Sequence, residues 1–573
     1  MSQTQKQQAP LGDNAMTGGE AMVRMLQNHD VEVIFGLCGD TSLPFYDALY
    51  RLDHGMRHVL TRDERSASYM ADVYARVSGK VGVCEGPSGG GATYILPGLA
   101  EANESSIALL SITSDIGVGS RGRFALTELD QKALFAPVTK WNAVVDTAAS
   151  LPRTVRRAFR EMTTGRPGAV HLGLPFDVQK APVDMDEVWG DSRMGAFPSL
   201  RSGPAPDAVA QAARKLSQAR HPLIICGGGP VIAGAQAELT RLAERLAAVV
   251  ATSISGQGSI LDSHRLSLGV VGSNGGCDET RAVVDSADVI LLIGCRAGSV
   301  TTERWRHPVP GAVSIIQIDV DGATIGTNYP TDVALIGDAK LALQALLDEL
   351  GEGDCDATDA ARRVAEAKRT KFARFEELAS QNVTPIRPER VIKELALLLP
   401  DDCVVVADPG TPCPYLSAYF EIDHPDKRLI SNRAHGALGY SLSGVLGAHV
   451  ARPSAKCVAV MGDGSFGFTA GEMETLVRTG APVTLIVFSN SVFGWIKAGQ
   501  DSGFGKRYFS VDFDRTDHAA VATAYGLKAW RVEDPADLRG ALKAALEHGG
   551  PTLVDVISQP LHEAEAPVTE WIA

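Results

Sequence analysis

Short apolar runs alternate with amphipathic, helix-like segments along most of the chain. In the first 185 residues, the apolar runs cover residues 31–35, 81–84, 108–112 and 169–172. Buried strands of a parallel sheet read as continuous apolar runs, and helices between them cover the faces of the sheet. The pattern therefore predicts an α/β unit in this part of the chain.

The same pattern recurs twice more, with apolar runs at 222–226 and 289–293, and then at 403–407 and 483–488. A polar stretch rich in Pro and Gly, residues 185–206, and a charged segment, 352–387, separate the units. A chain of 573 residues is long enough for about three or four domains. We predict domains at 1–185, 200–355 and 375–560, with 561–573 as a tail and candidate lid.

Composition narrows the classes of function. Hydrophobic residues make up 45% and charged residues 21% of the chain, which is typical of a soluble globular protein. No apolar run approaches the roughly 20 residues of a membrane span, and residues 1–8 lack the apolar core of a secretory signal, so we expect a cytoplasmic protein. The net charge of −14, without a basic cluster, argues against nucleic acid or membrane partners.

Nine cysteines are scattered without Cys-x-x-Cys spacing, which argues against a zinc site or a disulfide framework. A Gly-Gly-Gly run at 227–229 follows an apolar strand but lacks full G-x-G-x-x-G spacing, so a tight turn is favoured over a nucleotide site. The oxygen-bearing side chains of Asp463 and Asn490 indicate more specific chemistry.

Asp463 and Asn490 each end an apolar strand. Asp463 stands in Gly462-Asp463-Gly464, a helix is expected up to Gly480, and the next strand ends at Asn490. Carboxyl ends of parallel strands meet at the edge where α/β sheets bind ligands. Oxygen ligands suit Mg²⁺ carrying a phosphate, and the glycines and the helix start allow an anion to approach the backbone closely.

This motif resembles the diphosphate-binding motif of thiamine diphosphate enzymes of the acetohydroxyacid (acetolactate) synthase, pyruvate oxidase and pyruvate decarboxylase type. The resemblance implies that Mg²⁺ is bound by Asp463, Asn490 and the backbone carbonyl of Val492. It also implies cofactor contacts at Gly462, Asp463, Gly464, Ser465 and Asn490.

A second segment, residues 59–76, resembles the strand-to-helix segment that carries the activating glutamate of the same family, and the match continues through 88–93. The resemblance implies that Glu64 hydrogen-bonds the aminopyrimidine ring of the cofactor. A solvated carboxylate in a first helical turn is the alternative for an isolated Glu. The following helix shows buried positions at helical spacing, namely Ala67, Met70, Ala71 and Tyr74.

The resemblance covers nearly the whole chain. It implies an α/β fold of three doubly wound parallel-sheet domains (pyrimidine-binding, central and diphosphate-binding) and a homodimer or homotetramer whose subunits share active sites. Further cofactor contacts are expected at Gly410, Thr411, Gly436 and Leu438, with Leu438 as an apolar wedge against the cofactor or, alternatively, a core leucine. Candidate substrate-pocket residues are Asp40, His435, Phe493 and Trp495.

Lys497 is a further candidate for the substrate pocket. Core packing for the two aromatic residues Phe493 and Trp495, and a solvated surface position for Lys497, remain equal alternatives. The Gly-rich run 498–506 is a candidate lid, and Trp571 is a candidate cover for the mouth of the site. Flavin-bearing synthases have an Arg-Phe-Asp-Asp-Arg type segment where this chain has residues 296–300, Arg-Ala-Gly-Ser-Val, so FAD is not expected.

In this family, the cofactor ylide adds to a 2-oxo acid or acyl substrate, CO₂ leaves, and the resulting enamine is protonated or captured. Pyruvate-type decarboxylases protonate it with a histidine pair, but residues 111–117 contain no His, and residues 493–497 lack the Glu of those enzymes. Capture by a second carbonyl is therefore favoured, which indicates an acetolactate synthase-like carboligase.

One departure from the synthases argues against an acetohydroxyacid synthase in the strict sense: this chain has Leu126-Thr127-Glu128 where many synthases have Phe-Gln-Glu. Three alternatives to a carboligase also remain open. A nonoxidative 2-oxo acid decarboxylase or a 2-hydroxyacyl-CoA lyase is the next reading, the latter requiring an ADP-type pocket in the central domain. A non-catalytic homologue is disfavoured by the intact Glu64, Asp463 and Asn490.

Overall fold

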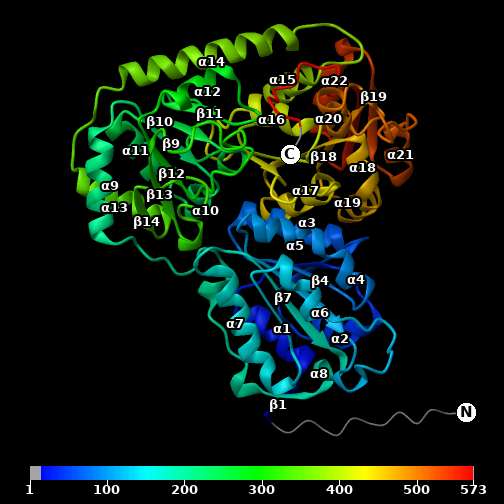
Figure 1. Ribbon diagram of the computed structural model, residues 1–573. Helices are drawn as coiled ribbons and strands as arrows, with labels where there is room; N and C mark the ends of the chain where they lie inside the picture. Colours follow the sequence, from blue (N-terminus) through cyan, green and yellow to red (C-terminus); the bar gives the residue numbers. More distant parts are fainter. Residues whose placement is uncertain (1–13, 572–573) are drawn as a thin grey trace, which may run out of the picture. The chain divides into compact units, whose positions relative to one another are not determined.

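The computed structural model describes residues 14–571 (Figure 1). The chain divides into two compact units, one of residues up to 75 together with 79–199, and one of residues 76–78 together with 200–571. Within the described residues there are three parallel sheets of six strands, and helices flank each of them. The predicted α/β class with three parallel-sheet domains is confirmed. Across residues 14–571, no helix has the length and apolar character to span a bilayer.

The sheet of the first unit has the strand order β3-β2-β4-β5-β7-β6. Its strands are β2 (Val33–Gly36), β3 (Arg57–Leu60), β4 (Gly82–Gly86), β5 (Leu109–Asp115), β6 (Trp141–Val144) and β7 (Ala169–Pro175). Its helices are α1 (Gly18–Asn28), α2 (Leu43–Arg51), α3 (Glu64–Ser78), α4 (Gly90–Tyr94), α5 (Leu96–Glu104), α6 (Gln131–Phe135), α7 (Leu151–Thr163) and α8 (Phe176–Lys180). A short antiparallel pair, β1 (Ala15–Thr17) and β8 (Pro182–Asp184), accompanies the sheet.

Helix α3 is buried more completely than its apolar spacing predicts. Ala67, Met70, Ala71 and Tyr74 are buried as expected, but Ser66, Ser68 and Asp72 are buried as well. Gly98 of α5 lies so close that an added Cβ would come within 2.2 Å of the Ser68 hydroxyl oxygen. The small polar residues thus allow close helix packing, which a count of apolar positions does not detect.

The central sheet has the strand order β11-β10-β9-β12-β13-β14. Its strands are β9 (Pro222–Cys226), β10 (Val249–Thr252), β11 (Ser267–Val270), β12 (Val289–Ile293), β13 (Ser314–Asp319) and β14 (Val333–Ile336). Its helices are α9 (Pro206–Gln218), α10 (Gly229–Ala233), α11 (Gln236–Leu246), α12 (Asp278–Asp285) and α13 (Ala339–Leu350).

The Gly-Gly-Gly run after β9 packs against the turn after β12. A Cβ added at Gly227 would lie 2.0 Å from the carbonyl oxygen of Gly294, and one at Gly229 would lie 2.6 Å from the Gly294 Cα. Two of the three glycines are therefore required for the close approach of two backbone segments. This is the tight turn that the spacing favoured.

The third sheet has the strand order β16-β15-β17-β18-β20-β19. Its strands are β15 (Cys403–Ala407), β16 (Arg428–Ser431), β17 (Lys456–Gly462), β18 (Thr484–Ser489), β19 (Lys528–Val532) and β20 (Thr552–Ile557). Helices of this part of the chain are α14 (Thr358–Ala379), α15 (Pro388–Leu398), α16 (Pro412–Tyr419), α17 (Tyr440–Ala451), α18 (Asp463–Thr469), α19 (Met473–Thr479), α20 (Gly494–Gly503), α21 (His518–Tyr525) and α22 (Pro535–Glu547).

Two predicted elements of this domain differ in the structure. The helix after Asp463 starts at Asp463 itself and is interrupted by a 3₁₀ turn at Ala470–Glu472, although it does end at Gly480, whose φ is +63°. The Gly-rich run 498–506 is mostly helical, because α20 continues to Gly503. The candidate lid is therefore largely a helix, since glycines in a helix that packs on the domain need not break it.

In each sheet the chain runs from the first strand toward one edge and then returns to the other side of that strand. In the third sheet the chain runs from β15 outward to β16 and returns to β17 on the other side of β15. In the first sheet the corresponding reversal lies between β2 and β4. Loops diverge at such a switch point and leave a crevice at the carboxyl ends of the strands, where doubly wound sheets bind ligands.

Candidate active site

Asp463 occupies the switch point of the third sheet, as the first residue of α18. Its Oδ2 accepts hydrogen bonds from the backbone N–H groups of Asn490 (2.8 Å) and Ser491 (2.6 Å), and its Oδ1 accepts one from Gly464 (2.9 Å). The side chain is buried, and burial raises the pKa of Asp463, while these three N–H donors oppose the rise. The carboxylate is thereby locked in one orientation.

Asn490 follows β18 and carries an amide without a partner. Both Nδ2 and Oδ1 are shielded from solvent, and neither has a hydrogen-bond partner among the described residues. Ser491 adopts a left-handed conformation, with φ of 58°, and brings Val492 to the wall of the site. A buried amide left unpaired costs stability, so this arrangement fits a site built for a ligand.

The oxygen atoms of Asp463, Asn490 and the Val492 carbonyl form a donor set of the hard type that Mg²⁺ prefers. Among residues 14–571, no three His, Cys, Asp or Glu side chains are grouped in a way that could hold a metal ion. A magnesium site at Asp463 therefore depends on an amide and a backbone carbonyl, which fits the residues present.

A cavity of about 530 Å³ lies beside Asp463, within the second unit. Its walls come from the turn after β15, the turn before α17, the start of α18, the start of α20, the loops after β11 and β12, and the C-terminal tail. The predicted residues that line it are Gly410, Thr411, His435, Gly436, Leu438, Gly462, Asp463, Gly464, Ser465, Val492, Phe493 and Trp495. The structure thus brings together predicted residues from four separate stretches of sequence.

Two glycines and a leucine shape the cavity wall. Gly436 has φ of +75°, and nothing lies within 4 Å of the position of an added Cβ, so the left-handed turn rather than crowding requires glycine there. At Gly464 an added Cβ would lie 2.8 Å from the Phe493 ring. Leu438 is half-buried at the wall rather than in the core.

Asp408 supports this wall, and sequence patterns did not identify it. It is fully buried after β15, and its carboxylate oxygens each accept a 3.0 Å hydrogen bond from a backbone N–H, of Tyr440 and of Ser441. These bonds join the start of α17 to the turn after β15 and so position Gly436 and Leu438. Its place directly after an apolar strand was the available signal.

Lys497 and the tail show two further placements. Lys497 pairs with Asp512 at 2.7 Å, its side chain is only 15% exposed, and it is not among the residues that line the cavity, so it is neither a lining residue nor a solvated surface residue. Trp571 does line the cavity, with its ring 5.1 Å from that of Trp495 in an edge-to-face arrangement. Arg433 lies over the Trp495 ring at 5.6 Å.

Glu64 lies in the first unit, at the first position of α3, where Asp63 caps the helix by accepting from Arg65 N–H. The Glu64 side chain is buried against the start of α4, since a Cβ added at Gly91 would lie 2.9 Å from its Oε1. Burial raises the pKa of Glu64. The alternative of a solvated carboxylate is therefore wrong.

A second buried carboxyl group, Glu85 of β4, was missed by the sequence patterns. Its Oε1 accepts from the hydroxyl group of Tyr46, which also lies 3.0 Å from His58 Nε2. Glu85 is paired in register with Gly36, where any Cβ would overlap the carboxyl group at 2.3 Å. Burial raises the pKa of Glu85, and its charge contributes to the raised pKa of Glu64.

Asp40 is exposed at the switch point of the first sheet, and its Oδ1 accepts from the N–H of Thr41 at 2.8 Å. The side chains beside it are hydroxyl groups, because Thr41 contacts Ser114 (2.7 Å) and Ser88 (3.1 Å), and Ser88 contacts Thr127 (2.7 Å). Asp40 and Glu64 thus belong to the first unit, and the cavity beside Asp463 belongs to the second.

Comparison with known proteins agrees with this geometry. Three segments match thiamine pyrophosphate enzymes: residues 16–134 match the N-terminal TPP binding domain, 209–346 the central domain and 408–556 the C-terminal TPP binding domain.

Curated relatives match along almost their whole length. A probable acetolactate synthase large subunit of Methanococcus aeolicus is 34% identical over 95% of this chain and 92% of its own, and an acetolactate synthase large subunit of Lactococcus lactis is 31% identical over 94% and 92%. A probable 2-ketoarginine decarboxylase of Pseudomonas aeruginosa is 33% identical over 94% of both chains. The chain therefore belongs to the thiamine pyrophosphate enzymes of the acetolactate synthase and pyruvate oxidase type, and it is an enzyme that forms or cleaves carbon–carbon bonds.

Proposed function

We propose that this protein is a thiamine diphosphate- and Mg²⁺-dependent carboligase that decarboxylates a 2-oxo acid and joins the remaining acyl carbon to a second carbonyl compound. The observation that carries the proposal is the pairing of a backbone-locked Asp463 with the unpartnered amide of Asn490. When bound, thiamine diphosphate supplies a nucleophilic carbon and an electron sink for loss of CO₂.

The residues of the second unit would hold the diphosphate end of the cofactor. Asp463, Asn490 and the Val492 carbonyl would bind Mg²⁺. The start of α18 and the glycine turns would contact the rest of the cofactor, through Gly410, Thr411, Gly436, Gly462, Gly464 and Ser465. Leu438, half-buried at the wall, would orient the cofactor rings by apolar contact.

Glu64 would hold a proton on its carboxyl group and donate it in a hydrogen bond to the aminopyrimidine ring. Its burial and the nearby charge of Glu85 both favour the protonated form, because each raises the pKa of Glu64. A protonated carboxyl at neutral pH is the state that such a hydrogen bond requires.

Ligation is favoured over protonation by the groups around Asp40. Thr41, Ser88 and Ser114 present hydroxyl groups, which are poor proton donors at neutral pH. Thr113, which precedes Ser114 on β5, lies 2.6 Å from the imidazole of His171. Burial lowers the pKa of His171 to about 3, so this imidazole stays neutral. Capture by a second carbonyl therefore competes with few proton donors.

A nonoxidative 2-oxo acid decarboxylase is the second candidate, and the 2-ketoarginine decarboxylase relative favours it. Product analysis separates the two functions. Enzyme, cofactor, Mg²⁺ and pyruvate are incubated with and without an acceptor aldehyde or a second 2-oxo acid, and the products are separated by chromatography. We expect a 2-hydroxy ketone or 2-hydroxy-3-oxo acid to dominate when acceptor is present. Free aldehyde alone, across several 2-oxo acids at saturating acceptor, would replace this proposal with the decarboxylase.

A 2-hydroxyacyl-CoA lyase finds less support. In the Gly-Gly-Gly run of the central sheet, Gly227 and Gly229 are required by close packing against Gly294, so the run itself is no argument for a diphosphate site. We propose that the enzyme works as a homodimer or homotetramer, with Glu64 and Asp463 of different subunits acting on one cofactor.

A further inference from the structure

The loops of the central sheet and the C-terminal tail contribute a polar wall to the cavity beside Asp463. This wall consists of Ser273 and Asn274 after β11, Ser299, Val300 and Arg304 after β12, and Glu570 with Trp571. Arg304 Nε lies 3.2 Å from Glu570 Oε1, and Arg306 Nη2 lies 3.1 Å from Glu570 Oε2. One carboxylate of the chain's own tail thus engages a guanidinium group that faces the cavity.

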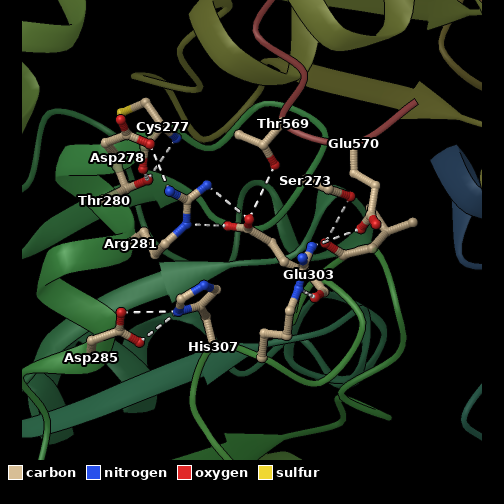
Figure 2. Close-up of polar contacts among 12 residues, drawn as sticks. Ser273, Cys277, Asp278, Thr280, Arg281, Asp285, Glu303, His307, Thr569 and Glu570 are labelled. Atoms are coloured by element: carbon tan, nitrogen blue, oxygen red, sulfur yellow. Dashed lines mark hydrogen bonds and ion pairs between the residues drawn. The ribbon is translucent and has the colours of Figure 1, made fainter. Parts of the chain in front are cut away.

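The turn that presents Arg304 has an unusual backbone. Glu303, Arg304 and Trp305 have φ values of 48°, 57° and 59°, which is the left-handed region for three consecutive residues with side chains. Such conformations persist only where the surroundings hold them, and they concentrate at functional sites. Here Arg281 holds Glu303 through two bonds of 2.9 and 2.8 Å, as Figure 2 shows.

The tail is fastened to the same turn. Thr569 donates its hydroxyl to Glu303 at 3.1 Å (Figure 2). Its backbone N–H donates to the Ser273 carbonyl at 3.0 Å. Val568 pairs with Asn274 in an antiparallel bridge. These bonds bring Glu570 to Arg304, and they are independent of the contact between the two charges.

Asn274 supplies an independent sign that this wall is built for a ligand. It is 1% exposed, it lines the cavity, and neither Nδ2 nor Oδ1 of its amide has a hydrogen-bond partner among the described residues. A guanidinium fork matches a carboxylate, and an amide matches a neighbouring carbonyl. A small acid with a carbonyl beside its carboxylate, a 2-oxo acid, satisfies both groups.

We propose that Arg304 binds the carboxylate of the 2-oxo acid substrate and that Glu570 holds this guanidinium group until substrate displaces it. The inference rests on the proposed function, because that function places a 2-oxo acid in this cavity. The Glu570 side chain is 20% exposed and that of Arg304 is 38% exposed, and partly exposed ion pairs exchange at small cost. After displacement, Glu570 retains Arg306 as a partner, so the tail stays near the cavity.

The test uses oxamate, a carboxylate whose neighbouring carbonyl is an unreactive amide, so that binding is measured without turnover. The enzyme is loaded with thiamine diphosphate and Mg²⁺, and oxamate binding is followed by calorimetry and by tryptophan fluorescence, which reports on the Trp571 and Trp495 pair. Arg304→Gln should weaken oxamate at least about tenfold, with Arg304→Lys intermediate. Glu570→Gln should tighten it by about two- to fivefold.

Arg306→Gln is the matched control, because Arg306 binds the same carboxylate and does not line the cavity. It should change oxamate affinity by less than about threefold. Equal losses in Arg304→Gln and Arg306→Gln, unchanged affinity in Arg304→Gln, or no oxamate binding by the wild type would each overturn the inference. If Arg304→Gln fails to fold, the direction of the Glu570→Gln effect decides.

The result of the oxamate test can be distinguished from the result of the product analysis that tests the proposed function. Loss of oxamate binding in Arg304→Gln together with free aldehyde as sole product would support the binding site and remove the carboligase. A ligated product together with unaltered oxamate binding in Arg304→Gln would leave the carboligase and remove the role of Arg304.

Discussion

Asp463 combines two demands on one side chain. Its orientation is set by three backbone N–H groups, and its free lone pairs are available to a cation beside Asn490. Orientation by the backbone explains why a carboxylate in a turn can act as a rigid ligand. The same bonds also join the ends of β17 and β18, so the residue has a structural role as well.

Replacing Asp463 by Ala tests the proposed metal site. We expect the affinity for thiamine diphosphate, measured by calorimetry with excess Mg²⁺, to fall at least about 100-fold, because the diphosphate loses its bridging cation. Asp514→Ala, which removes an exposed carboxylate of the same domain, should leave the affinity unchanged. Equal affinity in wild type and Asp463→Ala would remove Asp463 from the cofactor site, and EDTA should mimic the variant in wild type.

Glu85 makes stability depend on pH. Burial raises the pKa of Glu85 in the folded protein, and this effect exceeds the lowering by the hydrogen bonds of His58 and Tyr46. The charge of Glu85 in turn contributes to the raised pKa of Cys38 and of Glu64. A raised pKa means that folding favours the protonated carboxyl, so its contribution is full below the unfolded pKa and is lost as pH rises. Glu85→Gln keeps an acceptor for Tyr46 and removes the titration.

We therefore expect Glu85→Gln to gain melting temperature relative to wild type as the pH is raised from 5 to 8. Thermal unfolding of the cofactor-free protein at several pH values measures this difference. Asp47→Asn, an exposed carboxylate of α2, should run parallel to wild type. A difference that shrinks with rising pH would show that Glu85 is stabilised as the carboxylate by His58.

At the scale of elements, the turns after strands tolerate fewer side chains than the strands do. The turn after β9 passes within contact distance of the turn after β12, and Gly227 leaves no room for a methyl group beside the Gly294 carbonyl. Gly227→Ala should lower the free energy of unfolding by about 1–3 kcal/mol, because backbone atoms cannot move aside cheaply.

The matched control is Gly540→Ala in α22, where nothing lies within 4 Å of the added Cβ. It should raise the free energy of unfolding by up to about 1 kcal/mol, since alanine favours the helix. Denaturant unfolding of both variants measures the two opposite shifts. Destabilisation of both by similar amounts would show that the close approach at Gly294 is not the cause.

Other elements show why local pattern reasoning failed where it did. Helix α3 buries Ser66, Ser68 and Asp72 against close neighbours, so its polar positions are as much part of the core as its apolar ones. Helix α20 contains Gly494, Gly499 and Gly503 and still forms, with Gly494 and Ala498 buried. In both cases tertiary packing outweighed intrinsic propensity.

At the scale of the whole molecule, Glu64 and Asp463 belong to different compact units. If subunits share sites as proposed, a mixed dimer of a Glu64→Gln subunit and an Asp463→Ala subunit has one doubly altered site and one intact site. Random exchange makes half of the dimers mixed, so about a quarter of wild-type activity should return when the two inactive variants are mixed. Product formation after mixing under exchanging conditions measures it.

Ultracentrifugation of the mixture should show dimers or tetramers throughout. This control establishes that the variants are oligomers whose subunits can exchange. Each variant alone should stay inactive to within about 1% of wild type. A mixture that remains inactive, although labelled subunits have exchanged, would place both residues of a site in one subunit.

The sequence by itself determined the class of fold and the enzyme family. Continuous apolar runs specify buried parallel strands, and residues at strand ends, Asp463 and Asn490 among them, can only lie at the carboxyl edge of a sheet. These inferences depend on contacts that are near in sequence or follow from strand order, and in the structure the Asp463 carboxylate accepts a 2.8 Å hydrogen bond from the backbone N–H of Asn490.

Tertiary structure alone decided the burial and partners of Glu85, Asp408, Asn274 and Arg304. Glu85 is placed by the pairing of β4 with β2, opposite Gly36. Asp408 accepts a hydrogen bond from the backbone at the start of α17, and Arg304 pairs with Glu570 of the C-terminal tail. Each depends on segments tens to hundreds of residues apart, and charged or amide side chains have no periodicity that marks them. Their environment therefore exists only after the chain has folded, because burial and hydrogen bonding, rather than residue type, define it.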